Sequence, residues 1–217
     1  MKGLRATLFV VVAFTAILTL PAAAQVRVID YIGYGWETGL SAGDEFHFLG
    51  LSDFVDPIFG VDLGTEELTL HVTGLVVLSS IPVGGGTTMI SYSTGTMEIY
   101  QDAAQDSDWG INPPNASAPG SFVNGDLFFA GELIDLVMFR HADGTGYFTG
   151  NLNGTGGSMI AGSCSNCVYS WGGTFSSGSG AQLIEGYSMQ VDGVLEVDEA
   201  VSTDSAAWGS VKALYSN

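Results

Sequence analysis

The loop between Asp102 and Asn112 holds the residues whose types and spacing could bind a metal ion. Asp102, Asp106, Asp108 and Asn112 fall within eleven residues. Ca²⁺ takes about six to eight oxygen ligands from carboxylates, amides and carbonyls, all of which such a loop can supply. The segment lacks the glycine and the closing Glu of an EF-hand at the required offsets. Two interpretations stay open: a calcium site formed by these four residues, or a solvated acidic loop whose Asp side chains cap turns.

Two carboxylates elsewhere could support a different chemistry, the hydrolysis of a glycosidic bond. Glu98 lies in the segment 97–100 and Glu185 in the segment 184–187, both strand-like with aromatic neighbours. These few residues resemble strands of small secreted jelly-roll xylanases. The resemblance implies a catalytic nucleophile and acid held about 5 to 5.5 Å apart. The alternative is that each Glu is an outward-facing residue of an alternating strand.

Cys164 and Cys167 are the only cysteines of the chain. In an oxidising compartment, two cysteines at this spacing form a small-loop disulfide. A redox motif would need a βαβ context, which the surrounding Gly- and Ser-rich sequence does not supply. Zinc would need two further ligands, and the three histidines are scattered at positions 47, 71 and 141. We therefore expect a Cys164–Cys167 disulfide, and because its loop is so short it pins a turn and contributes about 2 kcal/mol at most.

An export signal occupies the first 24 residues. Lys2 and Arg5 precede an apolar run over 8–20, and three alanines at 22–24 then form a cleavage site before Gln25. The apolar run is too short to span a bilayer, and no later run of about 18 apolar residues follows. We predict a secretory signal peptide over 1–24, a single mature domain over 25–217 without a transmembrane helix, and a secreted location, whether extracellular, periplasmic or at the cell surface.

The mature chain is strongly acidic. The whole sequence has 5 basic and 23 acidic residues, and removing the signal peptide takes 2 basic residues, which leaves 3 − 23 = −20. Nucleic acid is excluded as a partner, because phosphate binding needs clustered Lys and Arg. Such a surface attracts divalent cations or cationic partners. The partner is therefore expected to be an extracellular ligand or surface component whose identity the residues do not reveal.

Period-2 alternation indicates an all-β fold. In the segment 67–73, three apolar side chains face one way and Thr69, His71 and Thr73 face the other way. With this segment, about nine or ten strands are expected, and the others cover 26–36, 45–51, 87–92, 96–100, 126–141, 146–152, 168–175, 187–197 and 208–215. The 31 glycines point to many turns between short strands. We predict an antiparallel β-sandwich or jelly roll, with a closed β-barrel as the alternative.

Gly, Pro and Asp residues predict where the strands end. Turn chemistry at 82–86, 93–95, 142–145 and 192–193 favours hairpin connections. Gly131, inside a long apolar run, is expected to mark a bulge or a bend. The segments 102–121 and 198–207 are predicted to be loops, and long loops are where function tends to lie.

Several short motifs resemble uncharacterised secreted bacterial Gly-rich β proteins that often carry a C-terminal sorting anchor. The motifs are the segments 96–100, 112–115, 124–127, 186–187 and 191–193. The resemblance implies a β protein at the cell surface and carries no known activity. The end of this chain, residues 211–217, has neither the apolar span nor the basic stop expected of such an anchor.

These observations favour a non-enzymatic β module that binds an unknown ligand and, in one of the two interpretations of the acidic loop, calcium. No hydrolase triad is recognisable in the sequence, because the Ser-rich stretches lack an identifiable pattern of His and Asp partners. The jelly-roll glycoside hydrolase is one alternative. A small outer-membrane β-barrel is another, although Thr69, His71 and Thr73 are too polar for a lipid-facing band.

Overall fold

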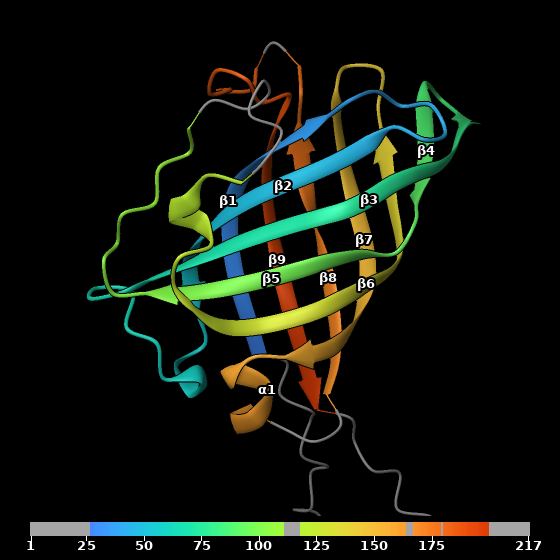
Figure 1. The fold of residues 1–217 in the computed structure, drawn as a ribbon. Coiled ribbons are helices and arrows are strands. Elements are labelled where there is room, and N and C mark those ends of the chain that lie inside the picture. The colour runs from blue at the N-terminus through green and yellow to red at the C-terminus, as the bar shows by residue number, and fades with distance from the viewer. Residues whose placement is uncertain (1–26, 111–117, 164–166, 179, 200–217) are drawn as a thin grey trace, which may run out of the picture.

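The described part of the chain folds into nine β-strands with three short helices. The computed structural model describes residues 27–110, 118–163, 167–178 and 180–199 (Figure 1). The strands are β1 (Arg27–Glu37), β2 (Glu45–Val55), β3 (Glu67–Gly84), β4 (Thr87–Tyr92), β5 (Gly95–Asp102), β6 (Asp126–Arg140), β7 (Thr145–Gly156), β8 (Cys167–Ser176) and β9 (Met189–Glu199). The helices are η1 (Pro57–Phe59), η2 (Gly120–Phe122) and α1 (Ser158–Ser163). The signal peptide and the strand expected over 208–215 lie outside the described residues.

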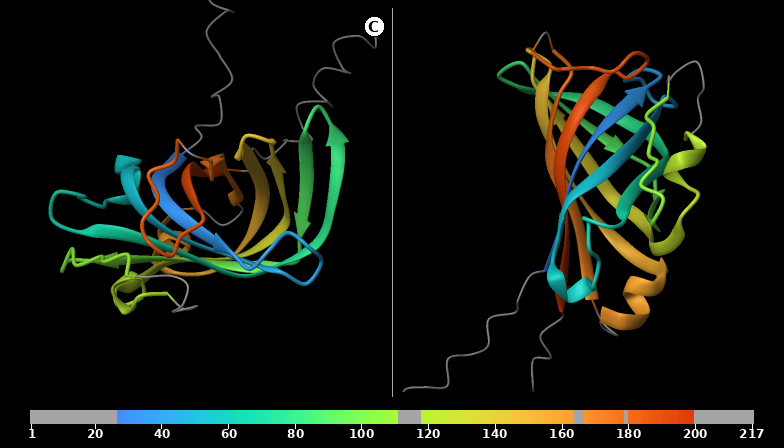
Figure 2. Two further views of the ribbon diagram at one scale, coloured as in Figure 1. Left: turned by 90° about the horizontal axis from the view of Figure 1, so that it is seen from above. Right: turned by 90° about the vertical axis from the view of Figure 1, so that its left-hand side faces the viewer.

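The strand pairings form one antiparallel sheet that closes on itself. The sheet order is β2-β1-β9-β8-β7-β6-β4-β3-β5, and the additional pairings β2–β3 and β6–β5 complete the circle. All ten pairings are antiparallel. The prediction of an antiparallel all-β fold of about nine strands is therefore confirmed, and the pairings correspond to the closed-barrel alternative (Figure 2). Within the described ranges, no helix has the length and apolar character needed to cross a membrane.

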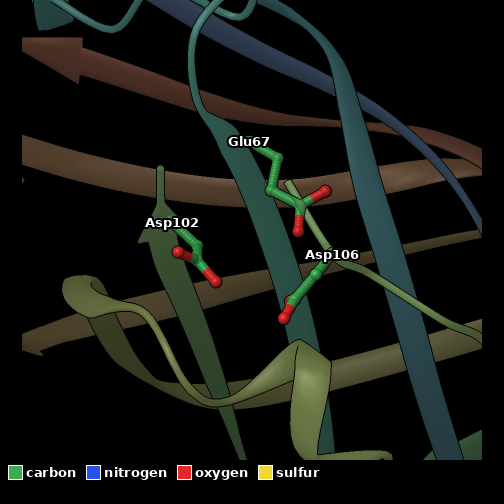
Figure 3. A group of neighbouring side chains, drawn as sticks. All are labelled: Glu67, Asp102 and Asp106. Carbon is green, nitrogen blue, oxygen red and sulfur yellow. The ribbon is translucent and has the colours of Figure 1, made fainter. Parts of the chain in front are cut away.

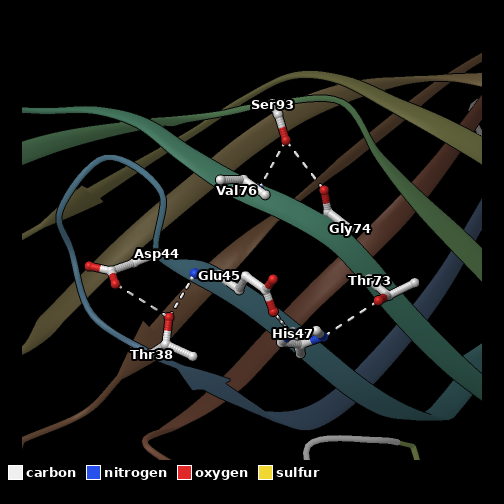
Figure 4. A network of polar contacts seen from close by, with 8 residues as sticks. All are labelled: Thr38, Asp44, Glu45, His47, Thr73, Gly74, Val76 and Ser93. Carbon is white, nitrogen blue, oxygen red and sulfur yellow. Dashed lines mark hydrogen bonds and ion pairs between the residues drawn. The ribbon is translucent and has the colours of Figure 1, made fainter.

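β4 and β5 follow one another along the same position in the barrel wall. The nine strands therefore form a barrel that is eight strands around. Both strands run antiparallel to β3 and to β6. Between them, Ser93 Oγ accepts a hydrogen bond from Val76 N at 3.0 Å and donates to Gly74 O at 3.3 Å (Figure 4). The prediction of a hairpin at 93–95 is wrong, because β4 and β5 on either side of this segment run in the same direction. The segment forms a kink between them.

Aromatic rings fill the interior of the barrel. Phe148 and Trp171 lie 4.6 Å apart, and Tyr31 and Phe48 lie 5.4 Å apart, measured between ring centroids. All four residues are buried and belong to one large apolar cluster to which every strand contributes. The inward positions are therefore packed with side chains, as in a small barrel with a filled core.

Glycines at other inward positions make room for these rings. A Cβ on Gly33 would lie 2.1 Å from Leu49 O and 2.5 Å from the Phe48 ring. Gly193 faces Tyr31 in the same way, with 2.4 Å between an ideal Cβ and the phenol oxygen. The prediction of a turn at 192–193 is wrong, because this dipeptide lies inside β9. The bulge predicted at Gly131 is confirmed by a register shift between Ala130 and Gly131.

An ion pair spans one end of the barrel. Arg140 ends β6 and donates from Nη1 to Glu37 Oε1, at the end of β1, across 2.5 Å. Because β1 and β6 are not neighbours in the sheet, the two side chains meet across the interior. Arg140 Nη2 also donates to Ser177 Oγ at 2.8 Å. Through Glu37 and Ser177, Arg140 thus links β6 to β1 and to the connection after β8.

A second apolar cluster lies outside the barrel wall. Trp36, Leu49, Phe122 and Tyr187 are buried there, with Trp109 packed against them. These residues come from β1, β2, the β5–β6 connection and the β8–β9 connection. Thr69 Oγ1 donates to Phe122 O at 3.0 Å, which holds the β5–β6 connection on β3. The described parts of the long loop predicted after Asp102 are residues 103–110 and 118–125. They pack against the outside of the barrel wall.

Candidate metal centre

Three carboxylates converge where β3 begins and β5 ends. Glu67, Asp102 and Asp106 each present an oxygen within 4.8 Å of the others (Figure 3). Glu67 is the first residue of β3 and pairs in register with Asp102, the last residue of β5. Asp106 comes from the loop that follows. Antiparallel pairing therefore brings together carboxylates that lie 35 positions apart in the sequence.

Hydrogen bonds hold these carboxylates in place. Glu67 is only 8% exposed and accepts from Ser107 N at 2.9 Å and from Ser107 Oγ at 2.8 Å. Asp102 Oδ1 accepts from Ala104 N at 2.8 Å. Asp106 Oδ1 accepts from Asn124 Nδ2 at 3.2 Å. The loop is thus bound to β3 on one side and to the segment before β6 on the other.

Gln105 turns the loop back towards β3. Its backbone is left-handed, with a φ of 51°, which a non-glycine residue adopts only when the surroundings support it. Its Nε2 donates to Leu63 O at 3.3 Å and to Glu66 O at 3.2 Å, so the side chain anchors the loop to the β2–β3 connection. This reversal carries Asp106 back beside Glu67.

Three of the four residues predicted as calcium ligands are described by the structure, and only two of them come together. Asp102 and Asp106 come together, whereas Asp108 is not part of the converging group. Asp108 Oδ1 accepts from Gly110 N at 3.1 Å, the turn-capping role that was the alternative interpretation. Asn112 lies outside the described residues. Glu67 was missed, because its proximity depends on the β3–β5 register and not on local spacing.

No positive side chain balances this group in the described part of the chain. Arg140 is the only Lys or Arg whose side chain is described, and it is bound to Glu37. Three ionised carboxylates at this distance repel one another, and a bound cation would remove that repulsion. The arrangement can therefore bind a cation through hard oxygen donors.

An acidic hollow lies on the outer face of β1, β2, β8 and β9. It measures about 400 Å³, and Asp30, Asp53 and Asp192 are among its lining residues. Partial burial, followed by repulsion from Asp53 and Asp192, raises the pKa of Asp30. These three carboxylates do not meet as closely as the group at Glu67. The hollow concentrates negative charge without forming a compact set of ligands.

The two carboxylates expected for glycoside hydrolysis lie in different surroundings. Glu98 is on β5 and accepts from Tyr100 Oη at 2.9 Å. Glu185 lies in an exposed turn before β9, not in a strand. Burial and the contact with Glu98 raise the pKa of Tyr100 to about 12. The described contacts of Glu98 are with its strand neighbours, and none of them involves Glu185.

His71 is partly buried beside Glu98. Its Nδ1 lies 3.9 Å from Glu98 Oε2 and has no hydrogen-bond partner among the described residues. Burial lowers the pKa of His71, His47 adds to this effect, and the Glu98 carboxylate opposes it. On the same face, His47 stacks on Trp36 with 4.9 Å between ring centroids.

We expect His71 to make stability depend on pH below about 6.5, the usual His pKa. The folded state binds a proton less readily than the unfolded state, so the free energy of unfolding falls as the pH drops from the unfolded pKa to the lower folded pKa. Urea unfolding between pH 7.5 and roughly pH 5 should show a shallower decline for His71→Asn than for the unchanged protein. The exposed His141 supplies the control, and equal slopes for His71→Asn and His141→Asn would contradict the prediction.

The cysteine prediction concerns a segment described only in part. Cys167 begins β8 and packs against the large apolar cluster. Cys164 lies outside the described residues, so the Cys164–Cys167 disulfide remains a prediction.

Comparison of the chain with known protein families, with curated proteins and with solved structures finds no match. The fold and the carboxylate group are therefore the basis on which a function can be argued.

Proposed function

We propose that the protein is an exported, non-enzymatic β-barrel module that binds Ca²⁺ where Glu67, Asp102 and Asp106 meet. The observation that carries this proposal is the approach of these three carboxylates to within 4.8 Å of one another, with Glu67 buried. A buried carboxylate beside two others is costly unless a positive charge accompanies it. A divalent cation supplies that charge.

The donor set favours Ca²⁺ over other divalent ions. All three side chains offer oxygen, the hard donor that Ca²⁺ and Mg²⁺ prefer, and zinc sites in proteins normally include nitrogen or sulfur. The ligands come from two strands and a loop, an irregular arrangement that Ca²⁺ accepts and that Mg²⁺, with its strict octahedral geometry, does not. Because Asp106 is exposed, we expect a weak site that fills at the millimolar calcium of extracellular fluids.

Calcium at this position would fasten the β5–β6 connection to the barrel. Asp106 and Trp109 belong to the same stretch of loop. Trp109 lies 4.9 Å from Tyr34 and 4.8 Å from Phe122, measured between ring centroids. Binding at Asp106 is thus coupled to the packing of the outer apolar cluster.

The distribution of polar residues favours this module over the predicted alternatives. In a barrel that crosses the outer membrane, an apolar band faces outward. Here four apolar residues of β9 lie in the core (Met189, Val191, Leu195 and Val197), and its outward positions include Asp192 and Glu196, both exposed. The glycoside hydrolase would need Glu98 and Glu185 across one groove, and the turn position of Glu185 lends it no support.

Calcium titration of the mature chain, residues 25–217, tests the proposal. A ligand that binds only the folded state adds about 2.7 kcal/mol at one hundred times its dissociation constant, so Ca²⁺ should raise the melting temperature and EDTA should reverse the rise. Mg²⁺ should have a smaller effect. NaCl at equal ionic strength controls for screening of the acidic surface.

Two variants of the same loop locate the site. Asp106→Asn should abolish the calcium-dependent shift, because it removes one of the three converging carboxylates. Asp108→Asn is the matched control and should keep the shift, because Asp108 caps its own turn. Equal shifts with Ca²⁺ and NaCl, or an unchanged response in Asp106→Asn, would refute calcium binding at this position.

A further inference from the structure

The β3–β4 hairpin extends from the barrel wall and exposes apolar side chains. Its tip, residues 78–86, is exposed at every position except Ser79. Leu78 is 60% exposed, Ile81 is 48% exposed and Val83 is 51% exposed. The hairpin projects at the β4 side of the molecule in Figures 1 and 2. Three large apolar side chains exposed within six residues of one hairpin make its tip a candidate surface for contact with another molecule.

The same hairpin is free of charge in a highly charged protein. Residues 72–97 contain no Asp, Glu, Lys, Arg or His, although the chain carries a net charge of −18. Two copies that approach through most other surfaces bring carboxylates together, which opposes association. Approach through this hairpin avoids that repulsion. The charge pattern therefore favours a second copy of the chain as the molecule that covers the tip.

One edge of β3 has no strand partner along the tip among the described residues. β3 pairs with β2 as far as Val76, and the loop before β2 adds bonds at Val77. Beyond Val77, the described backbone partners of β3 lie in β4 alone. Such an edge can pair with the same edge of another copy. Pro82 lacks a backbone N–H, so one donor is missing on each copy and the pairing is incomplete.

We propose that two copies associate through the β3 edge of this hairpin in an antiparallel, two-fold symmetric pair. The overlap of the unpaired stretch 78–84 is greatest when Ile81 lies opposite its own copy. One patch then serves both partners, as a two-fold interface requires. The tip comprises nine residues, fewer than the roughly 20 to 30 residues a side of a standard stable interface. The dimer is therefore weak, with a dissociation constant on the order of 100 µM.

Sedimentation equilibrium of the mature chain over a concentration series tests this dimer. NaCl should tighten it, because salt screens the repulsion between the two acidic bodies. Val83→Glu should weaken it by about tenfold or more, because association would bury the new carboxylate at the contact, opposite residue 79 of the second copy. Val168→Glu is the matched control, because Val168 is 55% exposed on β8, and this variant should dimerise like the unchanged protein.

A cross-linking experiment tests the symmetry of the contact. Ile81→Cys should form an intermolecular disulfide under mild oxidation, because antiparallel neighbours place their Cβ atoms about 4.5 to 5.5 Å apart. A chain that stays monomeric at millimolar concentration in high salt would overturn the proposal. Equal weakening by Val83→Glu and Val168→Glu would overturn it as well. So would a monomer that binds phosphatidylcholine vesicles through Val83, because the tip would then be a lipid contact.

Discussion

Replacing Gly33 by Ala is expected to destabilise the barrel by about 3 kcal/mol or more, a large share of the stability of a typical domain. The added Cβ would lie 2.1 Å from Leu49 O and 2.5 Å from the Phe48 ring. The first neighbour is backbone of the adjacent strand, so relief requires β1 and β2 to separate. Chemical unfolding followed by circular dichroism should give a lower midpoint, or no folded protein at all.

Gly120→Ala is the control for this prediction. No atom lies within 4 Å of an ideal Cβ at Gly120, and its φ is not in the left-handed region. We expect its stability to change by about 0.5 kcal/mol or less. If Gly33→Ala also unfolded at the wild-type midpoint, β1 and β2 would be less tightly packed than described, and the role assigned to the inward glycines would fail.

Replacing Arg140 by Met is expected to cost about 3 kcal/mol, the second large effect. The change removes the partner of Glu37, whose side chain is 11% exposed. Glu37 Oε2 already has no hydrogen-bond partner among the described residues, so its carboxylate would be left buried and uncompensated. The contact with Ser177 would be lost as well.

The double variant Glu37→Gln with Arg140→Met separates burial of charge from loss of packing. Removing the carboxylate charge should recover more than half of the loss, because a buried pair replaced by neutral groups is often nearly neutral in stability. Urea unfolding of both single variants and the double variant gives the coupling energy. Additive losses would show that the two side chains do not interact across the barrel.

Alternation of apolar and polar residues was sufficient to locate most strands. The segment 67–73 forms the first part of β3, and the segment 87–92 coincides with β4. The strand expected over 126–141 corresponds to β6, including its bulge at Gly131. A local pattern can predict these elements because burial of one face imposes the period of two.

Glycine-containing segments gave two errors. The dipeptide 192–193 was predicted to be a turn, yet Gly193 lies inside β9, where the Tyr31 side chain from β1 occupies the place of a side chain. The segment 93–95, which ends in Gly95, was also predicted to be a hairpin. It forms a kink between β4 and β5, which run in the same direction. Only the partners across the sheet distinguish a glycine in a turn from one that faces a ring. The short helix α1 was also missed, because six residues are too few to show a helical period.

The sequence by itself determined the antiparallel β class, the acidic character and the loop that carries Asp102 and Asp106. These properties depend on composition and on neighbours along the chain. The tertiary structure decided that the sheet closes, that Glu37 meets Arg140 across the interior and that Glu67 completes the carboxylate group. Each of these contacts joins residues far apart in sequence, and strand register, which is set by packing on every strand at once, brings them together.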